Sequence, residues 1–248
     1  MSRLIRGELL KLRTTRTFMG IMLAALALVL LIAGLGSALA SYGPADEPGR
    51  DMLGVGGIAQ PFALALGILA ISTEFRHGTI TPTLLTVPSR KRLMLAKVVA
   101  HGLAGLLLGL VSYGFSVLLA FPILSARGIP TELSTGTAIE LIGGGVVCVA
   151  LLTMIGVGIG AVVRNQVGAI MGAIGWWFVA EPLVATIPGI GPSVEKYGLG
   201  GAIAATGAEP IGGGGELGQV AGGLLLMAYA AIFAAAGIAV LRQRDVTA

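Results

Sequence analysis

The stretch FMGIMLAALALVLLIAGLGSALA, residues 18–40, decides the fold class of this chain, because its 23 successive residues carry no charged side chain. A helix of roughly 20 apolar residues crosses the hydrocarbon core of a bilayer, which is about 30 Å thick. The run is longer than the roughly 7–15 apolar residues of a cleaved signal peptide, although Ala38-Leu39-Ala40 resembles a cleavage site. The stretch therefore predicts a retained membrane span.

Five more apolar runs follow, at residues 53–73, 98–124, 141–163, 167–187 and 219–241. Hydrophobic residues make up 55% of the 248-residue chain and charged residues only 11%, whereas soluble domains carry about 25% charged residues. The pattern predicts an all-α integral membrane protein with six transmembrane helices, in one transmembrane domain over residues 1–248. The single cysteine excludes a disulfide framework.

The basic residues are concentrated in alternate segments between these runs. Thirteen of the 16 lysines and arginines lie in residues 1–17, 74–97, 164–166 and 242–248, whereas eight of the 12 acidic residues lie in the intervening segments. Lysine and arginine favour the cytoplasmic side of short loops, so both termini are expected in the cytoplasm. The net charge of +4 is thus a topology signal, and it is spread too widely for a nucleic-acid-binding stripe.

Residues 2–16, SRLIRGELLKLRTTR, predict a helix that lies along the membrane surface. At about 3.6 residues per turn, Arg3, Arg6 and Arg13 fall on one side, and the apolar side chains that fall on the other are Met1, Leu4, Ile5, Leu9 and Leu12. Glu8 interrupts the apolar side. Such a helix, within an interfacial segment over residues 1–17, would place its basic side against anionic lipid headgroups.

The segment EFRHGTITPTLLTVPSRKRLMLAK, residues 74–97, is the longest expected cytoplasmic loop. Its first four residues, Glu74 to His77, continue the helix of the second span. Gly78 can end that helix, and Ser89 is a good N-cap for the helix that leads into the third span. These residues fix the borders of the loop.

Between these borders the sequence predicts a very short helix over residues 82–87. Thr81 suits the N-cap, Pro82 suits the first helical position, and Pro88 stops the helix. A helix of this length is not stable alone, so it must dock either on the chain's own membrane face or on a cytoplasmic partner, and the pattern favours both equally. Its expected exposed apolar residues are Leu84, Leu85 and Val87.

The fifth run carries unusual residues. At about 1.5 Å per residue from Arg164, Trp176 and Trp177 lie near mid-bilayer, where they either line a cavity for an apolar substrate or pack against neighbouring helices. Glu181 is the one carboxylate well inside an expected span, near its outer edge, where it either reaches the membrane–water interface or relays protons. Pro182 should kink or end the helix.

Glycine marks two further features. Residues 188–218, expected outside the cell, include the glycine run 212–215 and the apolar stretch 197–206, so the segment is either a loose loop or a re-entrant piece that dips back into the membrane.

Within the spans, glycines recur at four-residue spacing, which lets helix backbones approach closely. These pairs are Gly105 with Gly109, Gly156 with Gly160, and Gly168 with Gly172.

The chain carries no motif for catalysis. No lysine directly follows a glycine, so there is no phosphate-binding P-loop. The two histidines, His77 and His101, form no H-E-x-x-H pair, and no serine lies in a G-x-S-x-G motif. We expect His101 to be a packed or interfacial histidine. The chain is therefore not expected to be an enzyme, or to hold a cofactor or metal ion.

Three segments resemble the membrane subunit, or permease, of ABC-2-type transporters, which are mainly bacterial exporters. GELLKLRTTRTF, residues 7–18, is similar to the family's basic helix along the membrane before the first span. Residues 74–97 are similar to its first cytoplasmic loop, in which an acid, an aromatic, a basic pair and a glycine precede a short coupling helix. RNQVGAI, residues 164–170, resembles its second cytoplasmic turn.

The resemblance implies a mechanism and a set of partners. Two permeases, identical or paired with a similar subunit, would bind two cytoplasmic ATPase subunits that hold ATP and magnesium. It implies a protein of the bacterial plasma membrane that exports an apolar or amphipathic substrate, either a lipid, an antibiotic or a peptide. The residues implied in ATPase coupling are Glu74, Arg76, His77, Gly78, Thr81, Pro82, Leu84, Leu85 and Val87. Those implied in the outer gate or pathway are Trp176, Trp177, Glu181 and Pro182.

Other interpretations fit the same six runs. A secondary transporter or channel working without an ATPase would need broken helices near the midplane, for which the sequence offers Gln60-Pro61 and Glu181-Pro182. A membrane anchor for another complex is a further alternative, whereas an intramembrane enzyme lacks a credible catalytic set. A nucleotide-hydrolysing partner that binds at Leu84 and Leu85 would separate the permease from these alternatives.

Overall fold

The computed structural model describes residues 1–43, 46–87, 89–131, 133–207 and 217–243, and within these ranges it is mainly helical and has no strand. Six stretches of helix are long and apolar enough to cross a membrane, and each overlaps one of the six expected runs. The all-α fold class is thus confirmed. The elements are α1 (Ser2–Thr14), α2 (Arg16–Leu39), α3 (Pro48–Gly54), the 3-10 helix η1 (Val55–Ala59), α4 (Gln60–Arg76), α5 (Ile80–Thr86), α6 (Arg90–Ala126), α7 (Thr135–Val163), α8 (Gln166–Gly175), the π-helix η2 (Trp176–Ala180), α9 (Glu181–Ala185), α10 (Gly191–Tyr197), α11 (Leu199–Ala205) and α12 (Gln219–Gln243).

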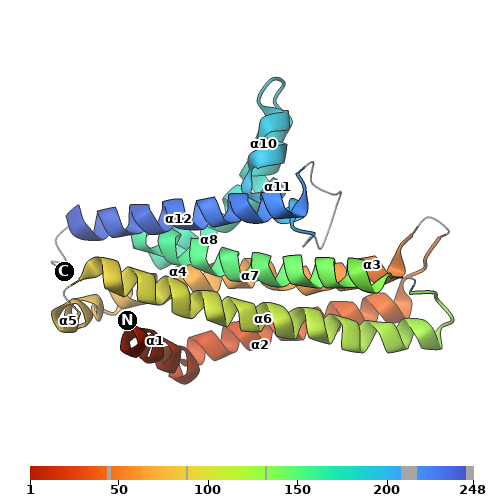
Figure 1. The fold of residues 1–248 in the computed structure, drawn as a ribbon, viewed down its shortest axis with the longest axis horizontal. Coiled ribbons are helices and arrows are strands. Elements are labelled where there is room, and N and C mark those ends of the chain that lie inside the picture. The colour runs from red at the N-terminus through yellow and green to blue at the C-terminus, as the bar shows by residue number, and fades with distance from the viewer. Residues whose placement is uncertain (44–45, 88, 132, 208–216, 244–248) are drawn as a thin grey trace.

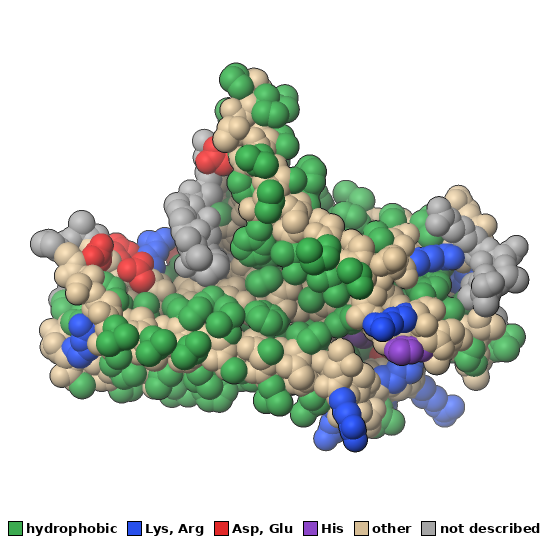
Figure 2. Space-filling view, turned by 180° about the vertical axis from the view of Figure 1, so that it is seen from behind, with side chains coloured by type: hydrophobic (Ala, Val, Ile, Leu, Met, Phe, Trp, Pro, Cys, Tyr) green, Lys and Arg blue, Asp and Glu red, His purple; other side chains and the backbone are tan. Residues whose placement is uncertain are grey.

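The long helices α2, α4, α6, α7 and α12 run side by side along the longest axis of the molecule (Figure 1). The short helix α5, the start of α1 and the end of α12 lie together at one end of this bundle, and α3 lies at the other (Figure 1). Seen from behind, the middle of the bundle exposes mainly hydrophobic side chains, while lysines and arginines stand toward the two ends (Figure 2). This distribution is the one expected of a protein that crosses a bilayer.

Helix α7 forms the centre of the bundle, where it packs against α4, α6 and α12. A Cβ atom added at Gly67 of α4 would overlap the Thr153 carbonyl oxygen of α7, and one added at Gly156 would overlap the Leu64 carbonyl oxygen of α4. Close backbone packing of this kind needs residues without a side chain. It confirms the expected role of the pairs Gly105 with Gly109 and Gly156 with Gly160.

The third glycine pair does not pack helices together. A Cβ at Gly168 would meet only its own capping residue Asn165, and one at Gly172 would meet nothing within 4 Å. Both glycines instead line an open cavity beside α8. The expectation that this pair supports helix packing is therefore wrong, because both glycines face the cavity and neither meets a neighbouring helix within 4 Å.

The fifth run is broken as Pro182 predicts, although the break takes an unexpected form. Proline has no backbone N–H to bond the carbonyl of the preceding turn, and the helix widens there into the π-helix η2, in which the Glu181 N–H donates to the Trp176 carbonyl oxygen. The chain then completes the short helix α9, which ends at Ala185. Single π turns within α-helices are frequently found at functional sites.

The segment after α9 is not a loose loop in its described part, because it folds into α10 and α11. Helices α9 and α10 stand out from the side of the bundle, and α11 returns against α12 (Figure 1). The stretch 197–206 is largely helical, as α11, and is packed on α12. The glycine run 212–215 and Pro88 lie outside the described residues.

Candidate functional site

The expected coupling loop begins with a tight helix end. Helix α4 stops at Arg76, and Gly78 takes a positive φ of 66°. The Gly78 N–H donates to the Phe75 carbonyl oxygen and the Thr79 N–H donates to the Glu74 carbonyl oxygen, which together form a Schellman motif. The prediction that Gly78 ends the second span is confirmed, and the motif holds α5 at a fixed angle to α4.

The short helix α5 begins two residues earlier than expected, at Ile80 rather than Pro82. Thr79 occupies the N-cap position and Thr81 lies inside the helix, so the prediction of Thr81 as the N-cap is wrong. The reason is that the first four N–H groups of any helix have no partner within it. Pro82 therefore loses no hydrogen bond at the third helical position and does not have to stand at the first.

Only one of the three expected apolar residues of α5 is strongly exposed. Leu85 is 79% exposed, whereas Leu84 and Val87 are partly buried against the core cluster that contains Ile80 and Ile71. Residues four and three apart share one helix face, so Ile80, Leu84 and Val87 face the chain's own bundle. The prediction that Leu84 and Val87 are exposed is therefore corrected, and Leu85 remains as the outward apolar side chain.

The next helix starts as predicted. The Ser89 hydroxyl accepts a hydrogen bond from the Arg92 N–H at 3.4 Å, which caps α6. The second turn between spans lies close by, because Arg76 donates to the Gln166 side chain at 3.4 Å and the Arg164 guanidinium lies 4.8 Å from the centre of the Phe75 ring. His77 is exposed beside them. The two loops at this end therefore form one surface.

Directly beneath this surface lies a cluster of four charged side chains, Glu8, Lys11, Glu74 and Lys97, which we call the ion cluster. The Lys97 ammonium group, whose side chain is 1% exposed, contacts Glu8 Oε2 at 2.9 Å and Glu74 Oε1 at 2.8 Å. Lys11 closes the ring, at 3.0 Å from Glu8 Oε1 and 2.9 Å from Glu74 Oε1. The cluster thus joins α1, the end of α4 and the start of α6.

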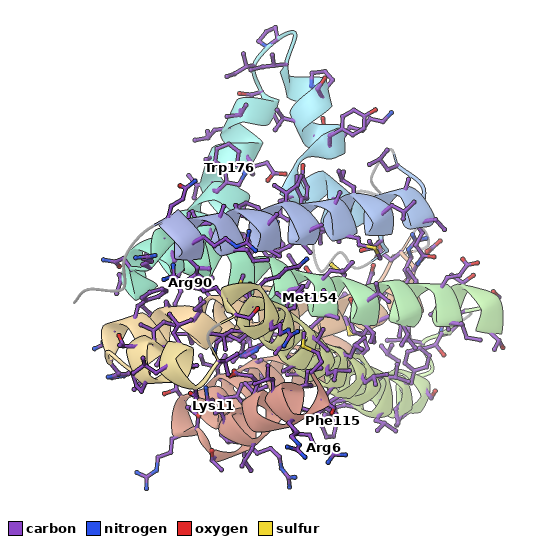
Figure 3. The ribbon with its side chains drawn as sticks, turned by 60° about the vertical axis from the view of Figure 1, so that its left-hand side comes forward. Arg6, Lys11, Arg90, Phe115, Met154 and Trp176 are labelled. Carbon is purple, nitrogen blue, oxygen red and sulfur yellow. The ribbon has the colours of Figure 1, made fainter. Side chains whose placement is uncertain are left out.

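The cluster explains the acid that interrupts the apolar side of the first helix. Figure 3 shows Lys11 on α1 near the loop that carries α5, while Arg6 lies on the outer side of α1. Glu8 is buried, as is Leu12 one turn later. An α1 helix that simply lay on the membrane surface would leave Glu8 facing lipid, and the pairing with Lys97 removes that cost.

The electrostatics of the cluster favour its charged form. Burial raises the pKa of Glu8, but the neighbouring Lys97 and Lys11 ammonium groups outweigh burial and hold the pKa of that carboxyl below its ordinary value. Burial lowers the pKa of Lys11, but hydrogen bonds and attraction from Glu74 and Glu8 raise it above its ordinary value. Both groups therefore stay ionised at neutral pH.

A cavity of about 310 Å³ adjoins the ion cluster and is lined in part by Glu8, Lys97 and His101. His101 is 3% exposed, and its Nδ1–H donates to the Lys97 carbonyl oxygen at 2.9 Å. The prediction that His101 is a packed histidine is confirmed. The hydrogen bond fixes the ring on the turn of α6 that begins at Lys97.

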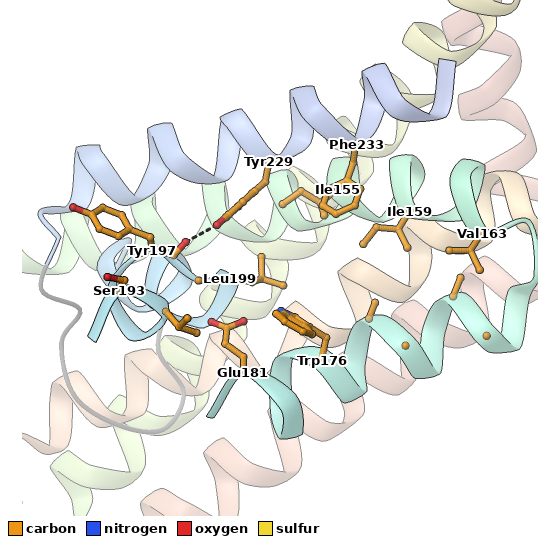
Figure 4. A pocket seen from close by; sticks show the side chains of 16 residues that line it. Ile155, Ile159, Val163, Trp176, Glu181, Ser193, Tyr197, Leu199, Tyr229 and Phe233 are labelled. Carbon is orange, nitrogen blue, oxygen red and sulfur yellow. Dashed lines mark hydrogen bonds between the residues drawn. The ribbon is translucent and has the colours of Figure 1, made fainter. Parts of the chain in front are cut away.

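A second cavity, of about 650 Å³, lies on the side of the bundle between α7, α8, α12 and the projecting α10 and α11. We call it the lateral cavity. Figure 4 shows Trp176 and Glu181 on its wall, opposite Tyr229 and Phe233 of α12. The lining is largely apolar, and Gly168 and Gly172 leave its α8 side without side chains. This is the cavity in which the residues Trp176 and Glu181 meet.

Glu181 is buried within the fold of the chain. Its side chain is 5% exposed, and Oε1 accepts a hydrogen bond from the Gly200 N–H at 2.6 Å, at the start of α11. The reason is that α11 folds back over α9 and covers the carboxyl group. Glu181 Oε2 is buried and accepts no hydrogen bond from the described residues.

The other two residues expected at the outer gate are not part of the cavity wall. Trp177 packs against the main core cluster and against the Phe178 ring, with 4.7 Å between ring centroids. Pro182 is exposed and acts on the backbone of η2. The two tryptophans thus differ, since Trp176 lines a cavity and Trp177 packs against neighbouring helices.

Sequence reasoning missed the pairing of Glu8 with Lys97, which lie 89 positions apart. Two signals pointed toward it, because an acid stood on the apolar side of one expected helix and a lysine stood at the start of an expected span. Tyr229 was also missed. Its hydroxyl donates to the Tyr197 carbonyl oxygen and so holds α10 against α12, and nothing in the local sequence singles it out.

Comparison with known proteins identifies a family for the part of the chain that contains the ion cluster and α5, and the match stops before Glu181 of the lateral cavity. A family described as ABC-2 family transporter protein matches residues 4–179, which is well over half of the chain. The matched region runs from α1 into η2, and it includes the ion cluster and α5 but ends two residues before Glu181. No curated protein matches the chain.

Proposed function

Because the chain belongs to the ABC-2 transporter family, we propose that it is the permease subunit of an exporter that a separate ATPase drives. The family match and the six candidate spans identify a multi-pass membrane protein of a transport family. ATP and its magnesium ion would be bound by the ATPase, since this chain has no P-loop. On this proposal the chain itself is not an enzyme.

The arrangement of α5 carries the proposal. Ile80, Leu84 and Val87 fix the helix to the bundle, while Leu85 is 79% exposed and free to enter a groove on a partner. A force applied at Leu85 would be passed to α4 through the Schellman motif at Gly78 and to α6 through its capped start at Ser89. The ion cluster would carry the same movement to α1, because Lys97 joins all three helices.

The proposed orientation places the α5 end of the bundle and both termini in the cytoplasm of a bacterium, with the protein in its plasma membrane. The concentration of basic residues in alternate segments supports it. A cysteine placed at Asp46 should react with an impermeant thiol reagent added outside, and one placed at Ser89 only with reagent added inside. The reverse pattern would overturn this orientation.

The complete transporter would hold two permeases, identical or similar, and two ATPase subunits. The α2 helix and the α8–α9 segment expose most of their apolar side chains on this single chain, which supports a second permease or membrane lipid beside them. The lateral cavity, with its apolar lining, supports an apolar or amphipathic substrate on the export path.

Co-purification tests the proposal. The tagged chain is extracted in mild detergent, and proteins that accompany it are measured by mass spectrometry. We expect a P-loop ATPase in a near one-to-one ratio with the permease. Absence of any such ATPase, even after cross-linking in intact membranes, would contradict the proposal and favour a transporter or membrane anchor that works alone.

A further inference from the structure

The lateral cavity combines an apolar wall with one buried carboxylate. Ile159, Phe233 and Trp176 contribute apolar surface from three different helices (Figure 4). The Tyr229 hydroxyl also faces the region, but its proton is already donated to the Tyr197 carbonyl oxygen. The Glu181 carboxylate is therefore the strongest acceptor on the wall.

The two oxygens of this carboxylate are in different situations. Oε1 accepts from the Gly200 N–H at 2.6 Å and so has a structural role at the start of α11. Oε2 is buried and has no hydrogen-bond partner among the described residues. A buried polar atom without a partner destabilises a protein, and a buried charge needs a compensating one. Because Glu181 lines the lateral cavity, a donor group bound in that cavity can supply the missing partner when the carboxyl group turns toward it.

We propose that the lateral cavity binds a cationic amphiphile, whose apolar body lies along Trp176, Ile159 and Phe233 and whose ammonium or guanidinium N–H donates to Glu181 Oε2. The proposal rests on the proposed function, because it names the substrate class that the permease would carry. Charge complementarity favours a cationic ligand over a neutral or an anionic one. A neutral lipid tail packs against the apolar lining equally well but leaves Oε2 without a partner, and an anion is repelled by the carboxylate.

The chain supplies its own reporter, because it has only two tryptophans. Trp176 lines the cavity and is 52% exposed, whereas Trp177 packs against the core. A bromine atom quenches tryptophan fluorescence only at short range. The experiment titrates the purified permease, in phosphatidylcholine nanodiscs at pH 7, with 6-bromohexylamine and with the neutral 6-bromohexan-1-ol. A Trp177→Phe variant isolates the signal of Trp176, and a Trp176→Phe variant in the otherwise unchanged chain should lose the quenching.

The decisive variant is Glu181→Gln, which keeps a carbonyl oxygen for the Gly200 N–H and removes the negative charge. Glu140→Gln is its matched control, because Glu140 is an exposed carboxylate on α7 and away from the cavity lining. We expect Glu181→Gln to weaken binding of the amine about tenfold or more, as loss of a hydrogen bond to a charged group predicts. Binding of the alcohol should change less than about twofold, and Glu140→Gln should behave as the unchanged chain.

Three results would overturn the proposal. The amine and the alcohol could bind with equal affinity, or the amine could bind the Glu181→Gln and unchanged chains with equal affinity. Either result would show that the cavity binds apolar ligands whatever their charge. Trp176 that is quenched in separated monomers but protected in dimers would show that a second copy fills the cavity. The titration needs no ATPase, so a failed titration alongside a co-purifying ATPase would remove only the substrate class and leave the proposed transport function standing.

Discussion

The ion cluster and the lateral cavity both bury glutamate, but they treat its charge differently. At the α5 end, Glu8 and Glu74 share two ammonium groups, with all four charged contacts between 2.8 and 3.0 Å. In the lateral cavity, Glu181 Oε1 accepts from the Gly200 N–H at 2.6 Å, at the start of α11, and Oε2 has no described partner. The difference is that the first two charges face ammonium groups of the same chain, whereas the Glu181 carboxyl group meets hydrogen-bond donors but no cation among the described residues.

The two regions therefore suit different tasks. A ring of paired charges that joins α1, α4 and α6 resists separation, since breaking it leaves a buried ion alone. It is suited to carrying movement between helices. An apolar cavity with a single acceptor is suited to recognising a ligand by its polar group.

Replacement of Lys97 should have the largest effect on the free energy of unfolding. Lys97→Met leaves two buried carboxylates with only Lys11 to compensate them, and removal of one member of a buried ion pair costs about 3–5 kcal/mol. We expect a marked fall in the thermal unfolding temperature in detergent. Arg6→Gln, on the exposed side of α1, is the control and should change stability by no more than about 0.5 kcal/mol.

The exposed face of α5 should affect partner binding rather than stability. Leu85→Asp places a charge where an apolar groove is expected, so ATPase recovered in co-purification should fall at least about tenfold, which corresponds to about 1.4 kcal/mol. The unfolding temperature should stay the same, because Leu85 is 79% exposed. Leu84→Asp should instead lower the unfolding temperature, since Leu84 packs against the core. Unchanged ATPase recovery with Leu85→Asp would remove this residue from the interface.

Removal of the charge at Glu181 should be nearly neutral for folding. Glu181→Gln keeps the acceptor for the Gly200 N–H and removes a buried charge that has one unpartnered oxygen. We expect a change in unfolding free energy below about 1 kcal/mol, smaller than that of Glu8→Gln in the ion cluster. If the two variants were equally destabilised in a thermal unfolding assay, the contrast between the regions would fail.

Lowering the pH should reduce the contribution of the ion cluster to stability gradually, and this effect should be smaller than those of the substitutions above. Since the folded pKa of Glu8 is lowered, its contribution to stability is present above the ordinary value of 4.5 and is lost as the pH falls through the lower folded value. Unfolding temperatures measured from pH 6 downward should therefore converge between the unchanged chain and Glu8→Gln. Curves that stay parallel below that range would contradict the assignment.

Much of the fold could be predicted from the sequence, because a membrane span is a local property. A run of some 20 apolar residues needs no partner to be recognised, and the end of α4 at Gly78 and the cap of α6 at Ser89 depend on one or two residues each. The start of α5 was misplaced because Pro82 is tolerated anywhere in the first turn. Local rules alone could not choose between those positions.

The sites could be predicted only in part, because they depend on contacts between distant segments. Glu8 and Lys97 meet across 89 positions, and Glu181 is covered by α11, which no periodicity placed over it. Leu84 and Leu85 are identical in chemistry and adjacent in sequence, yet only the packed bundle decides which one faces outward. The sequence identified the right residue types, and the packing assigned their roles.

Site-specific cross-linking from α5 tests whether this helix couples the permease to an ATPase. The one native cysteine, Cys148, is fully buried, so a cysteine introduced at position 85 is the accessible thiol. In intact membranes, Leu85→Cys with a short bifunctional reagent should capture a P-loop ATPase, and Leu84→Cys should capture far less because its side chain faces the bundle. Capture of no ATPase by Leu85→Cys, or equal capture from both positions, would contradict the account of α5 as the coupling helix.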